Sequence, residues 1–457
     1  MPQGFGLGDT IAAVATAPGE AAVAMVRISG PQCRQILSRI FRPFRKRRLE
    51  PWRLSHGRVV DPVDGGVIDE ALAVLMPGPR SYTAEDLVEV HCHGGRLAPR
   101  GVLEVILRAG ARPAEPGEFT LRAFLNGRLD LAQSESVLDI IQARTAQARR
   151  LALAGLEGQL SSRISHLREQ LLEVRAHLEA SLDFSEDDLP LRDVRPDIEP
   201  VLAAVRGLLA VADQGIVARR GVRTAIVGRP NVGKSSLLNA LLRSERAIVT
   251  SVPGTTRDTV EETADLGGVP FWLIDTAGLR ETDDAVELIG VMRSRAALES
   301  ADLVLFVLDR STRLEIDDRR LANELRARPT VAALNKTDLS PRVEQEEARA
   351  LVGDAPLVAV SALTGEGLAD LETALLERSV GRLVEHELAV ATPHQKEALF
   401  RAEGALSTAL SAIGEGASQD ILAGEVATAV RALGEITGQD ATEDLLDAIF
   451  ARFCIGK

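Results

Sequence analysis

The sequence predicts a multidomain protein of the α+β and α/β classes, with an N-terminal α+β domain, a helical domain, and an α/β domain inserted into the helical one. Three observations support this fold class. The chain has 457 residues, and domains of about 100 to 200 residues imply two to four of them. Strand-like and helix-like segments alternate over residues 221–380, which predicts a mostly parallel sheet covered by helices. Helical periodicity lies on both sides of that region.

The N-terminal region, residues 1–121, has the pattern of a compact α+β domain. Short apolar runs typical of strands, AAVAMVRI, ALAVLM and DLVEVHC, are separated by Gly and Pro. Helix-like segments such as GVLEVILRAG lie between them. We therefore expect a sheet with helices packed on it.

Residues 122–220 have the spacing of long amphipathic helices. Apolar residues that recur every three or four positions predict one helix face: Leu160, Ile164, Leu167, Leu171, Val174, Leu178 and Leu182. Pro190 would end this helix, and residues 201–209 predict a second one. Helical patterning returns over residues 381–457. Because one layer of helices cannot bury its own apolar face, we expect this tail to pack on residues 122–220.

Charge and cysteine content limit the class of protein. The chain has 53 Lys and Arg against 66 Asp and Glu, a net charge of −13, which argues against a protein that coats nucleic acid non-specifically. Its three cysteines, Cys33, Cys92 and Cys454, are too few and too far apart for a disulfide framework or a paired-cysteine zinc site. We see no secretion signal and no stretch of about 18 uncharged apolar residues, so we expect a cytoplasmic protein.

Two local features leave alternatives open. A basic run could contact RNA phosphates or form a solvated loop; it contains Arg39, Arg42, Arg45, Lys46, Arg47 and Arg48. His91, Cys92 and His93 are residue types that bind metals. Alternation along a strand would direct Cys92 to the opposite face from the two histidines, which argues against a metal site there.

Residues 228–235, GRPNVGKS, match the pattern GxxxxGK[ST] of a phosphate-binding loop. The segment follows the strand-like run TAIV and precedes the helix-like run SLLNALL, which is the context that the motif requires. Its glycines allow backbone N–H groups to surround phosphates at a helix N-terminus. Lys234 can reach the outer phosphates, and Ser235 can bind Mg²⁺.

Two segments after this loop are typical of switch regions in a nucleotide-hydrolysing domain. Thr255 and Thr256, in PGTTRD, offer hydroxyl groups that can close over Mg²⁺ and the γ-phosphate. The segment DTAG, residues 275–278, follows the strand-like run FWLI. The carboxylate of Asp275 can therefore approach the Mg²⁺ shell, and the N–H of Gly278 can face the γ-phosphate.

Two later segments indicate which base is bound. In NKTD, residues 335–338, Asp338 can accept hydrogen bonds from the ring N–H and the exocyclic amine of guanine, a donor pair that adenine lacks. Backbone contacts from Ser361, Ala362 and Leu363 would support the base. The sequence therefore predicts GTP as the nucleotide.

Two residues near the predicted nucleotide site, Glu287 and Asn231, each have two interpretations. Many small GTPases have Gln directly after DTAG, but this chain has Leu279, which cannot orient water. Glu287 could polarise water, or it could be a solvated charge on a helix. Likewise Asn231 could be a turn former, or its amide oxygen could bind a monovalent cation beside the phosphates.

The GTPase motifs, together with several segments outside the GTPase region, resemble those of a known family. They include DTIAAVAT, VRISG, SYTAEDLVEVHCHGG, RPAEPGEFTLRAFLNGRLDLAQSE, ALGEITG and the terminal FCIGK. These segments resemble the MnmE family, also called TrmE, of tRNA modification GTPases. The resemblance implies a dimerising folate-binding domain (1–121), a helical domain in two parts (122–220 and 381–457) and an inserted GTPase domain (221–380).

The resemblance also implies an activity and a partner. With an FAD-dependent MnmG-type protein, in a heterotetramer, such a chain forms aminomethyl or carboxymethylaminomethyl groups at C5 of the wobble uridine of certain tRNAs. The cofactors implied are Mg²⁺, K⁺ and 5-formyltetrahydrofolate or a related tetrahydrofolate, with FAD on the partner.

Site residues follow from matching these motifs. The predicted GTP site contains Asn231, Val232, Gly233, Lys234, Ser235, Ser236, Thr250, Ser251, Val252, Pro253, Gly254, Thr255, Thr256, Asp275, Thr276, Ala277, Gly278, Asn335, Lys336, Thr337, Asp338, Ser361, Ala362 and Leu363. Within it, Mg²⁺ would bind Ser235 and Thr256, and K⁺ would bind Asn231, Thr250, Val252 and Thr255.

The same resemblance makes Glu287 the catalytic glutamate and gives Cys454 a role in the modification chemistry. Folate would bind at four charged residues: Arg27, Glu85, Arg128 and Lys457. Arginine and lysine suit the carboxylates of the folate glutamate tail, and Glu85 suits the aminopyrimidine edge.

The chain departs from the family pattern in three places. Residues 17–22 read APGEAA in place of a PPGRG-type loop, Arg128 replaces a common Lys, and residues 289–294 read IGVMRS in place of IGIERS. The alternative function is a ribosome-assembly GTPase switch that binds rRNA. Such proteins need an RNA-binding appendage, for example a KH domain, whereas this chain has an acidic balance and the CIGK tail.

Overall fold

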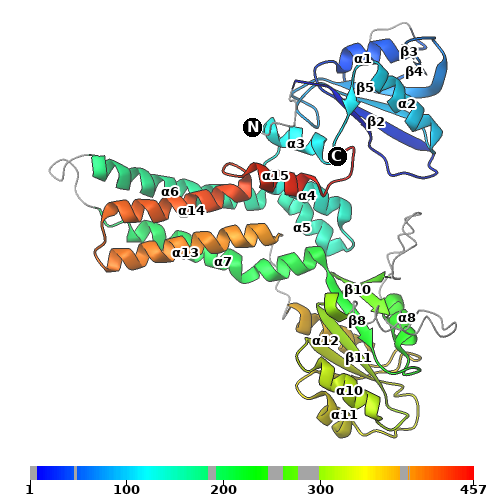
Figure 1. Cartoon of the computed structure of the whole chain (residues 1–457), viewed down its shortest axis with the longest axis vertical. Helices are drawn as coiled ribbons and strands as arrows, with labels where there is room; N and C mark the ends of the chain where they lie inside the picture. Colours follow the sequence, from blue (N-terminus) through cyan, green and yellow to red (C-terminus); the bar gives the residue numbers. More distant parts are fainter. Residues whose placement is uncertain are drawn as a thin grey trace. The chain divides into compact units, whose positions relative to one another are not determined.

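A computed structural model describes residues 8–45, 49–183, 192–244, 261–275, 298–380, 390 and 392–457. The chain forms two compact units, each made from several segments. Unit 1 contains Met1–Leu138, Gly155–Asp197 and Thr408–Lys457, and unit 2 contains Asp139–Ala154 and Ile198–Ser407. Figure 1 shows the helices and strands of both units.

Unit 1 contains a sheet whose strand order is β3-β4-β5-β6-β2-β1-β7. The strands are β1 (Ile11–Val14), β2 (Val23–Ser29), β3 (Phe41–Pro43), β4 (Ser55–Val60), β5 (Val67–Met76), β6 (Leu87–His93) and β7 (Arg112–Pro113). Neighbouring strands are antiparallel except β1 and β7, which are parallel. Helices α1 (Cys33–Ile40) and α2 (Leu97–Arg108) share one core with the strands. This is the expected α+β domain.

The opposite face of this sheet packs on helix α3 (Glu118–Leu125). Ile11 and Ala13 of β1 alternate with Ala12, and they form a second, small core with Phe119 of α3. Helix α3 therefore holds its polar side chains against the face of the sheet that α1 and α2 leave uncovered.

The helical part of unit 1 is built around an extensive contact between α6 (Gln159–Asp183) and α14 (Gln419–Thr437) (Figure 1). Six of the seven apolar residues expected on one face of α6 are buried, from Leu160 to Leu178. The expectation was wrong for Leu182, which is 49% exposed near the end of the helix. Helices α4 (Leu131–Gln142) and α15 (Glu443–Phe450) form a further core with Phe453 of the C-terminal tail.

Unit 2 pairs helix α7 (Arg195–Arg220) with α13 (Pro393–Gly414). Among the described helices, α7 has the length and composition of a membrane span, which the sequence was not expected to contain. Two charged residues within this helix form ion pairs with α13: Arg206 with Glu403 at 2.8 Å and Asp213 with Lys396 at 2.6 Å. These contacts are typical of a helix in a bundle rather than in lipid.

The α/β part of unit 2 has a sheet with strand order β13-β12-β11-β8-β10-β9. Its strands are β8 (Val222–Val227), β9 (Glu261–Leu266), β10 (Val269–Asp275), β11 (Leu303–Asp309), β12 (Thr330–Asn335) and β13 (Leu357–Ala359). All pairs are parallel except β9 with β10. The parallel pairs explain the continuous apolar runs, because both faces of the sheet are covered.

Two cores lie on the two faces of this sheet. Helices α8 (Lys234–Ser244) and α12 (Leu368–Val380) pack on one face, and α10 (Ile316–Leu325) and α11 (Gln345–Val352) pack on the other. The predicted fold class is therefore confirmed: an α+β domain, helices, and an α/β domain with a mostly parallel sheet.

Candidate functional site

The phosphate-loop motif lies between β8 and α8, as the sequence requires. Three of its residues have left-handed backbone conformations: Gly228 (φ 158°), Asn231 (φ 64°) and Gly233 (φ 97°). A Cβ atom at Gly228 would lie 2.4 Å from the Val307 carbonyl oxygen, so only glycine fits there. The loop curves around Lys234, whose buried ammonium group donates hydrogen bonds to the carbonyls of Gly228 and Arg229, both at 2.8 Å.

The NKTD segment is joined to this loop through Asn335, the last residue of β12. Asn335 Nδ2 donates to the Val232 carbonyl at 2.9 Å, and Asn335 Oδ1 accepts from the Ala362 amide at 3.1 Å. A Cβ atom at Gly233 would lie 2.3 Å from Asn335 Nδ2. One buried amide side chain therefore connects the phosphate loop, NKTD and the segment after β13.

Lys336 forms a second connection. Its ammonium group donates to the Asn231 carbonyl at 2.8 Å and pairs with Asp309 Oδ2 at 2.6 Å. Burial would raise the pKa of Asp309, but hydrogen bonds from Lys336 and Ser311 outweigh burial and lower it. Asp309 was missed in the sequence, although it ends β11 as Asn335 ends β12, and carboxyl ends of parallel strands form binding edges.

The residue expected to read the base, Asp338, lies beside the segment after β13. Ser361 Oγ donates to Asp338 Oδ1 at 2.6 Å, which fixes the orientation of the carboxylate. The Thr337 amide donates to the Val360 carbonyl at 3.1 Å. The side chain of Leu363 is 84% exposed, so only its backbone could support a base.

Arg229, the second residue of the phosphate loop, forms ion pairs with residues at the start of helix α10. Its Nε donates to Asp318 Oδ1 at 2.8 Å, and its Nη1 pairs with Glu315. Glu315 and Asp318 also form the capping box of α10. These residues, which the loop motif does not reveal, anchor the loop to a helix N-terminus.

Several predicted site residues lie outside the described part of the chain. They are Thr250, Ser251, Val252, Pro253, Gly254, Thr255, Thr256, Thr276, Ala277, Gly278, Leu279 and Glu287. The backbone of Asp275 is described: it ends β10 opposite Ile226 of β8, the strand that leads into the phosphate loop.

A second constellation lies in unit 1, where the C-terminal tail meets the sheet. Arg27 of β2 donates from Nη1 to the Gly456 carbonyl at 3.2 Å and pairs with Glu89 at 2.8 Å. The Phe119 amide donates to the Lys457 carbonyl at 3.1 Å. Burial and the nearby Arg27 charge lower the pKa of Lys457. Arg27 and Lys457, which are at opposite ends of the sequence, are therefore close together.

An aromatic ring joins two of the predicted folate residues. The guanidinium carbons of Arg27 and Arg128 lie 5.3 Å and 5.1 Å from the centroid of the Tyr82 ring. Arg128 Nη1 also donates to the Tyr82 carbonyl at 3.1 Å, and the Tyr82 hydroxyl bonds Thr120 Oγ1 at 2.8 Å. Tyr82 was not among the predicted site residues, although it lies in the same SYTAED segment as Glu85.

Glu85 is fixed by a buried charge network. Ser29 Oγ donates to Glu85 Oε2 at 2.8 Å, and Arg122 Nη1 pairs with it at 3.2 Å. Arg122, which is 2% exposed, also pairs with Asp9 at 2.6 Å and Glu118 at 3.0 Å. Ser29 and Arg27 lie two residues apart on β2, so their side chains share one face. The structure thus brings Arg27 and Arg128 to the Tyr82 ring, places Lys457 near Arg27, and holds Glu85 through Ser29 and Arg122.

The remaining candidates are placed as follows. Cys454 is exposed, and its carbonyl accepts from the Lys457 amide at 3.3 Å. Cys92 is buried, and burial raises its pKa to about 11. His93 bonds Asp69 at 2.7 Å and His91 lies 3.5 Å from Glu89. Over the described residues, no three His, Cys, Asp or Glu side chains are grouped as metal ligands.

Family models match most of the chain. A model described as the MnmE helical domain matches residues 131–454, and one described as the GTP-binding protein TrmE N-terminus matches residues 10–128. The chain is 49% identical over 470 residues to a protein from Heliobacterium modesticaldum named tRNA modification GTPase MnmE, covering 99% of this chain and 100% of that protein. The chain belongs to the MnmE family of tRNA modification GTPases.

Other MnmE relatives agree in length and extent. A protein of the same name from Symbiobacterium thermophilum is 50% identical, covering 98% of this chain and 99% of that one. Similar solved structures include the G domain of the T. maritima FeoB iron transporter, with 31% identity, a TM-score of 0.27, and coverage of 34% of this chain and 98% of that one. Aquifex aeolicus Era bound to GDP·AlF4⁻ has 27% identity and a TM-score of 0.28, covering 40% of this chain and 65% of that one.

Proposed function

We propose that this MnmE-family chain is a potassium-dependent GTP hydrolase that acts with an FAD-dependent MnmG-type partner. Together they form aminomethyl or carboxymethylaminomethyl groups at C5 of the wobble uridine of certain tRNAs, using a folate one-carbon unit. One observation carries the GTPase part: Asn335 and Lys336 join the NKTD segment to the phosphate loop at 2.9 Å and 2.8 Å. The similarity to full-length relatives named tRNA modification GTPase MnmE supports the choice of substrate.

The geometry around Asp338 favours guanine. Ser361 donates a hydrogen bond to one oxygen of the Asp338 carboxylate, which fixes its orientation. The carboxylate can still accept further hydrogen bonds. Two N–H donors on a guanine edge suit such a carboxylate, whereas adenine would leave it unpaired in a polar site.

The donor types suit the proposed metal ions. Ser235 lies in the first turn of α8, where a hydroxyl can bind Mg²⁺ beside phosphates. The side chain of Asn231 is exposed, while its backbone is held by Lys336. Its amide oxygen is a hard ligand of the kind that K⁺ accepts, together with Thr250, Val252 and Thr255. Such a cation would supply positive charge beside the phosphates, and we assign Glu287 the task of polarising the attacking water.

The cluster around Tyr82 suits a folate. Arg27, Arg128 and Lys457 offer cationic donors for carboxylates, and contact with the Tyr82 ring keeps the guanidinium groups of Arg27 and Arg128 near each other. Glu85 can accept hydrogen bonds from an aminopyrimidine edge in addition to its existing contacts with Ser29 and Arg122. We place Cys454, three residues before Lys457, near the modification chemistry.

We further propose that the protein is a cytoplasmic homodimer that forms a heterotetramer with the MnmG-type protein and binds tRNA. Its domains would be 1–121, 122–220 with 381–457, and 221–380. A ribosome-assembly role is the competing function, and no contact in the described residues favours it.

The deciding experiment is nucleoside mass spectrometry of tRNA from cells that lack the protein. The wobble uridine should lack its C5 modification in these cells. Expression of wild-type protein should restore the modification, whereas expression of the Glu287→Ala or Cys454→Ser variant should not. Normal wobble uridine together with defective rRNA processing would instead support the ribosome-assembly role. Replacing K⁺ by Na⁺ should slow GTP turnover; unchanged turnover would contradict the cation assignment alone.

A further inference from the structure

The exposed side of strands β3 and β4 in unit 1 forms a basic and aromatic surface that the proposed chemistry does not use. We propose that this surface binds a single-stranded segment of tRNA, with bases stacked on its rings and phosphates held by its arginines. The inference rests on the proposed function, because it names where the same tRNA is held. We term this surface the β3–β4 patch. Phe44, Arg45, Arg53 and His56 line its hollow, Arg58 contacts the Phe44 ring, and the exposed Trp52 directly precedes Arg53 in the chain.

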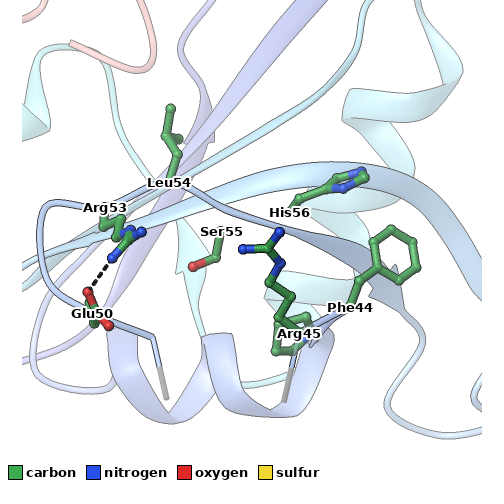
Figure 2. Close-up of a pocket in the computed structure, with 8 residues that line it drawn as sticks. Phe44, Arg45, Glu50, Arg53, Leu54, Ser55 and His56 are labelled. Atoms are coloured by element: carbon green, nitrogen blue, oxygen red, sulfur yellow. Dashed lines mark hydrogen bonds and ion pairs between the residues drawn. The ribbon is translucent and has the colours of Figure 1, made fainter. Parts of the chain in front are cut away.

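The patch is concave and positively charged. It surrounds a hollow of about 310 Å³, and Figure 2 shows the guanidinium groups of Arg45 and Arg53 on either side of Ser55, with Phe44 and His56 at one end. Arg53 pairs with Glu50 at 2.9 Å, but the two side chains are 63% and 51% exposed. An exposed pair of this kind contributes little to stability, so a phosphate can replace the carboxylate at small cost.

A row of like charges crosses the neighbouring strands. Arg42 of β3 is directly opposite Arg58 of β4, and like charges in this register repel each other. Arg42 Nη1 donates to the carbonyls of Ser38 and Phe41, at 2.9 Å and 3.2 Å. Glu70 of β5 is opposite Arg58, but it bonds His56 at 2.9 Å. With Arg45 and Arg53, these arginines outnumber Glu50 and Glu70. This local excess is opposite in sign to the net charge of the chain, −13, and it suits a polyanion.

The exposed rings indicate what kind of polyanion fits. Trp52 is 57% exposed and has a φ of 60°, which is unusual for so bulky a residue; its amide is held by the Leu75 carbonyl at 2.9 Å. Phe44 is 47% exposed, and its ring centroid lies 4.7 Å from the His56 ring centroid and 5.2 Å from the guanidinium carbon of Arg58.

Unpaired bases stack on exposed aromatic rings and arginine planes, whereas an RNA duplex keeps its base faces covered. An acidic protein segment would satisfy the arginines without using the rings. The combination therefore favours single-stranded RNA, such as the anticodon loop that contains the wobble uridine.

A binding experiment on the full chain tests the charges. The probe is a labelled anticodon stem-loop RNA, compared with a fully paired RNA of equal length, and wild-type protein should prefer the stem-loop. The double substitution Arg45→Glu with Arg53→Glu should weaken stem-loop binding at least about tenfold. Loss of two phosphate contacts on a single strand should also reduce the slope of log Kd against log salt by about 1.4.

A matched control has the same change in net charge elsewhere in unit 1. Arg96→Glu with Arg100→Glu changes exposed residues at the start of α2, where Arg100 pairs with Glu104 at 2.9 Å and is 78% exposed. This variant should bind the stem-loop within about twofold of wild type. Equal weakening by both double variants would reduce the effect to net charge and overturn the proposal.

A second experiment tests the rings. The sequence contains two Trp residues, so Trp272→Phe leaves Trp52 as the reporter, and its fluorescence should fall when the stem-loop binds. Trp52→Asn should weaken binding at least about fivefold without changing the salt slope; Asn tolerates the left-handed backbone at this position. Phe400→Ala, which changes a residue that is 61% exposed in unit 2, should have no effect. Unchanged Trp52 fluorescence and unchanged affinity would overturn the proposal.

The outcomes separate this inference from the proposed function. Absence of wobble-uridine modification by wild-type protein would contradict the function itself. If the patch variants kept full affinity for the stem-loop but altered the sedimentation of the chain, the patch would be a protein contact and the inference would be wrong. GTP turnover without RNA should equal that of wild type in every patch variant.

Discussion

Asp338 shows how one carboxylate can decide the choice of nucleotide. Its neighbour Ser361 donates to one oxygen at 2.6 Å, so the side chain is oriented before any base arrives. A preorganised acceptor of this kind loses little entropy on binding.

Asp338→Asn should reverse the base preference. The variant replaces an acceptor by an amide donor, and two charge-assisted hydrogen bonds of about 1.5–3 kcal/mol each are lost. GTP should bind at least about 100-fold more weakly, and xanthosine triphosphate, whose edge offers an acceptor, should bind better than GTP. Calorimetry with both nucleotides measures this, with Asp354→Asn, an exposed aspartate of the same sheet unit, as the control. Equal affinity of Asp338→Asn and wild type for GTP would remove Asp338 from the base site.

Arg122 illustrates a different kind of residue, one that acts through its neighbours. It is 2% exposed and is surrounded by Asp9, Glu85 and Glu118. Burial would raise the pKa of Glu118, but hydrogen bonds from Arg112, the Glu115 amide and Arg122 outweigh burial, and the pKa lies below its usual value of 4.5. The stabilisation from this carboxylate is therefore complete above pH 4.5 and is lost as the pH falls through the lowered pKa.

Arg122→Met should lower the free energy of unfolding of unit 1 by about 3–5 kcal/mol at pH 7, because buried carboxylates lose their partner. The difference from wild type should shrink below about pH 4.5, where the carboxyls become protonated. Urea unfolding followed by Trp52 fluorescence, in a Trp272→Phe background, gives both values. The control is Arg34→Met, which breaks the exposed Arg34–Asp86 pair and should cost about 1 kcal/mol or less. A pH-independent difference for Arg122→Met would contradict this account.

At the scale of elements, helices α4 and α7 are tied by an ion pair between Asp139 and Arg219 in unit 2. Burial raises the pKa of Asp139 to about 6, although Arg219 opposes the shift. A carboxyl with a raised pKa binds its proton more readily in the folded state. Its contribution therefore increases as the pH falls from about 6 toward the usual value of 3.8, and is lost as the pH rises through 6.

Asp139→Asn should flatten this pH dependence. Between pH 7 and pH 4, wild-type unit 2 should gain up to about 3 kcal/mol that the variant does not gain. The measurement is urea unfolding at several pH values, followed by Trp272 in a Trp52→Phe background. Parallel pH profiles for the variant and wild type would show that Asp139 titrates normally.

The helices and strands also show which structural features the sequence patterns predict. The apolar spacing of α6 predicted its buried face from Leu160 to Leu178, because a helix of fixed period must bury one stripe. The same spacing was wrong for Leu182, since periodicity does not reveal where the partner helix ends. Likewise the phosphate-loop motif predicted the strand and helix around it, whereas Arg229, Asp309 and Asp318 were missed because their partners come from other elements.

At the scale of the whole molecule, the chain forms two compact units with separate cores. Each unit contains one of the two tryptophans, Trp52 in unit 1 and Trp272 in unit 2. Separate cores permit separate unfolding transitions.

GTP with Mg²⁺ should therefore raise the unfolding temperature that Trp272 reports for unit 2. In the same way, 5-formyltetrahydrofolate should raise the unfolding temperature that Trp52 reports for unit 1. At 100 times Kd, each ligand stabilises the unit that it binds by about 2.7 kcal/mol. Thermal scans of Trp52→Phe and Trp272→Phe proteins separate the two signals. A single transition in which either ligand shifts both reporters equally would contradict independent units.

The sequence by itself determined the local features: the strand and helix periods, the glycine-rich loop between β8 and α8, the order of the GTPase motifs and the family resemblance. These depend on neighbouring residues, whose spacing sets backbone conformation and the exposed face. Only the tertiary structure decided that Arg27 meets Gly456, 429 positions away, and that Glu85 shares a buried network with Arg122. Such contacts depend on how the chain returns to the same sheet, and no local spacing encodes which distant side chains then lie within hydrogen-bonding distance.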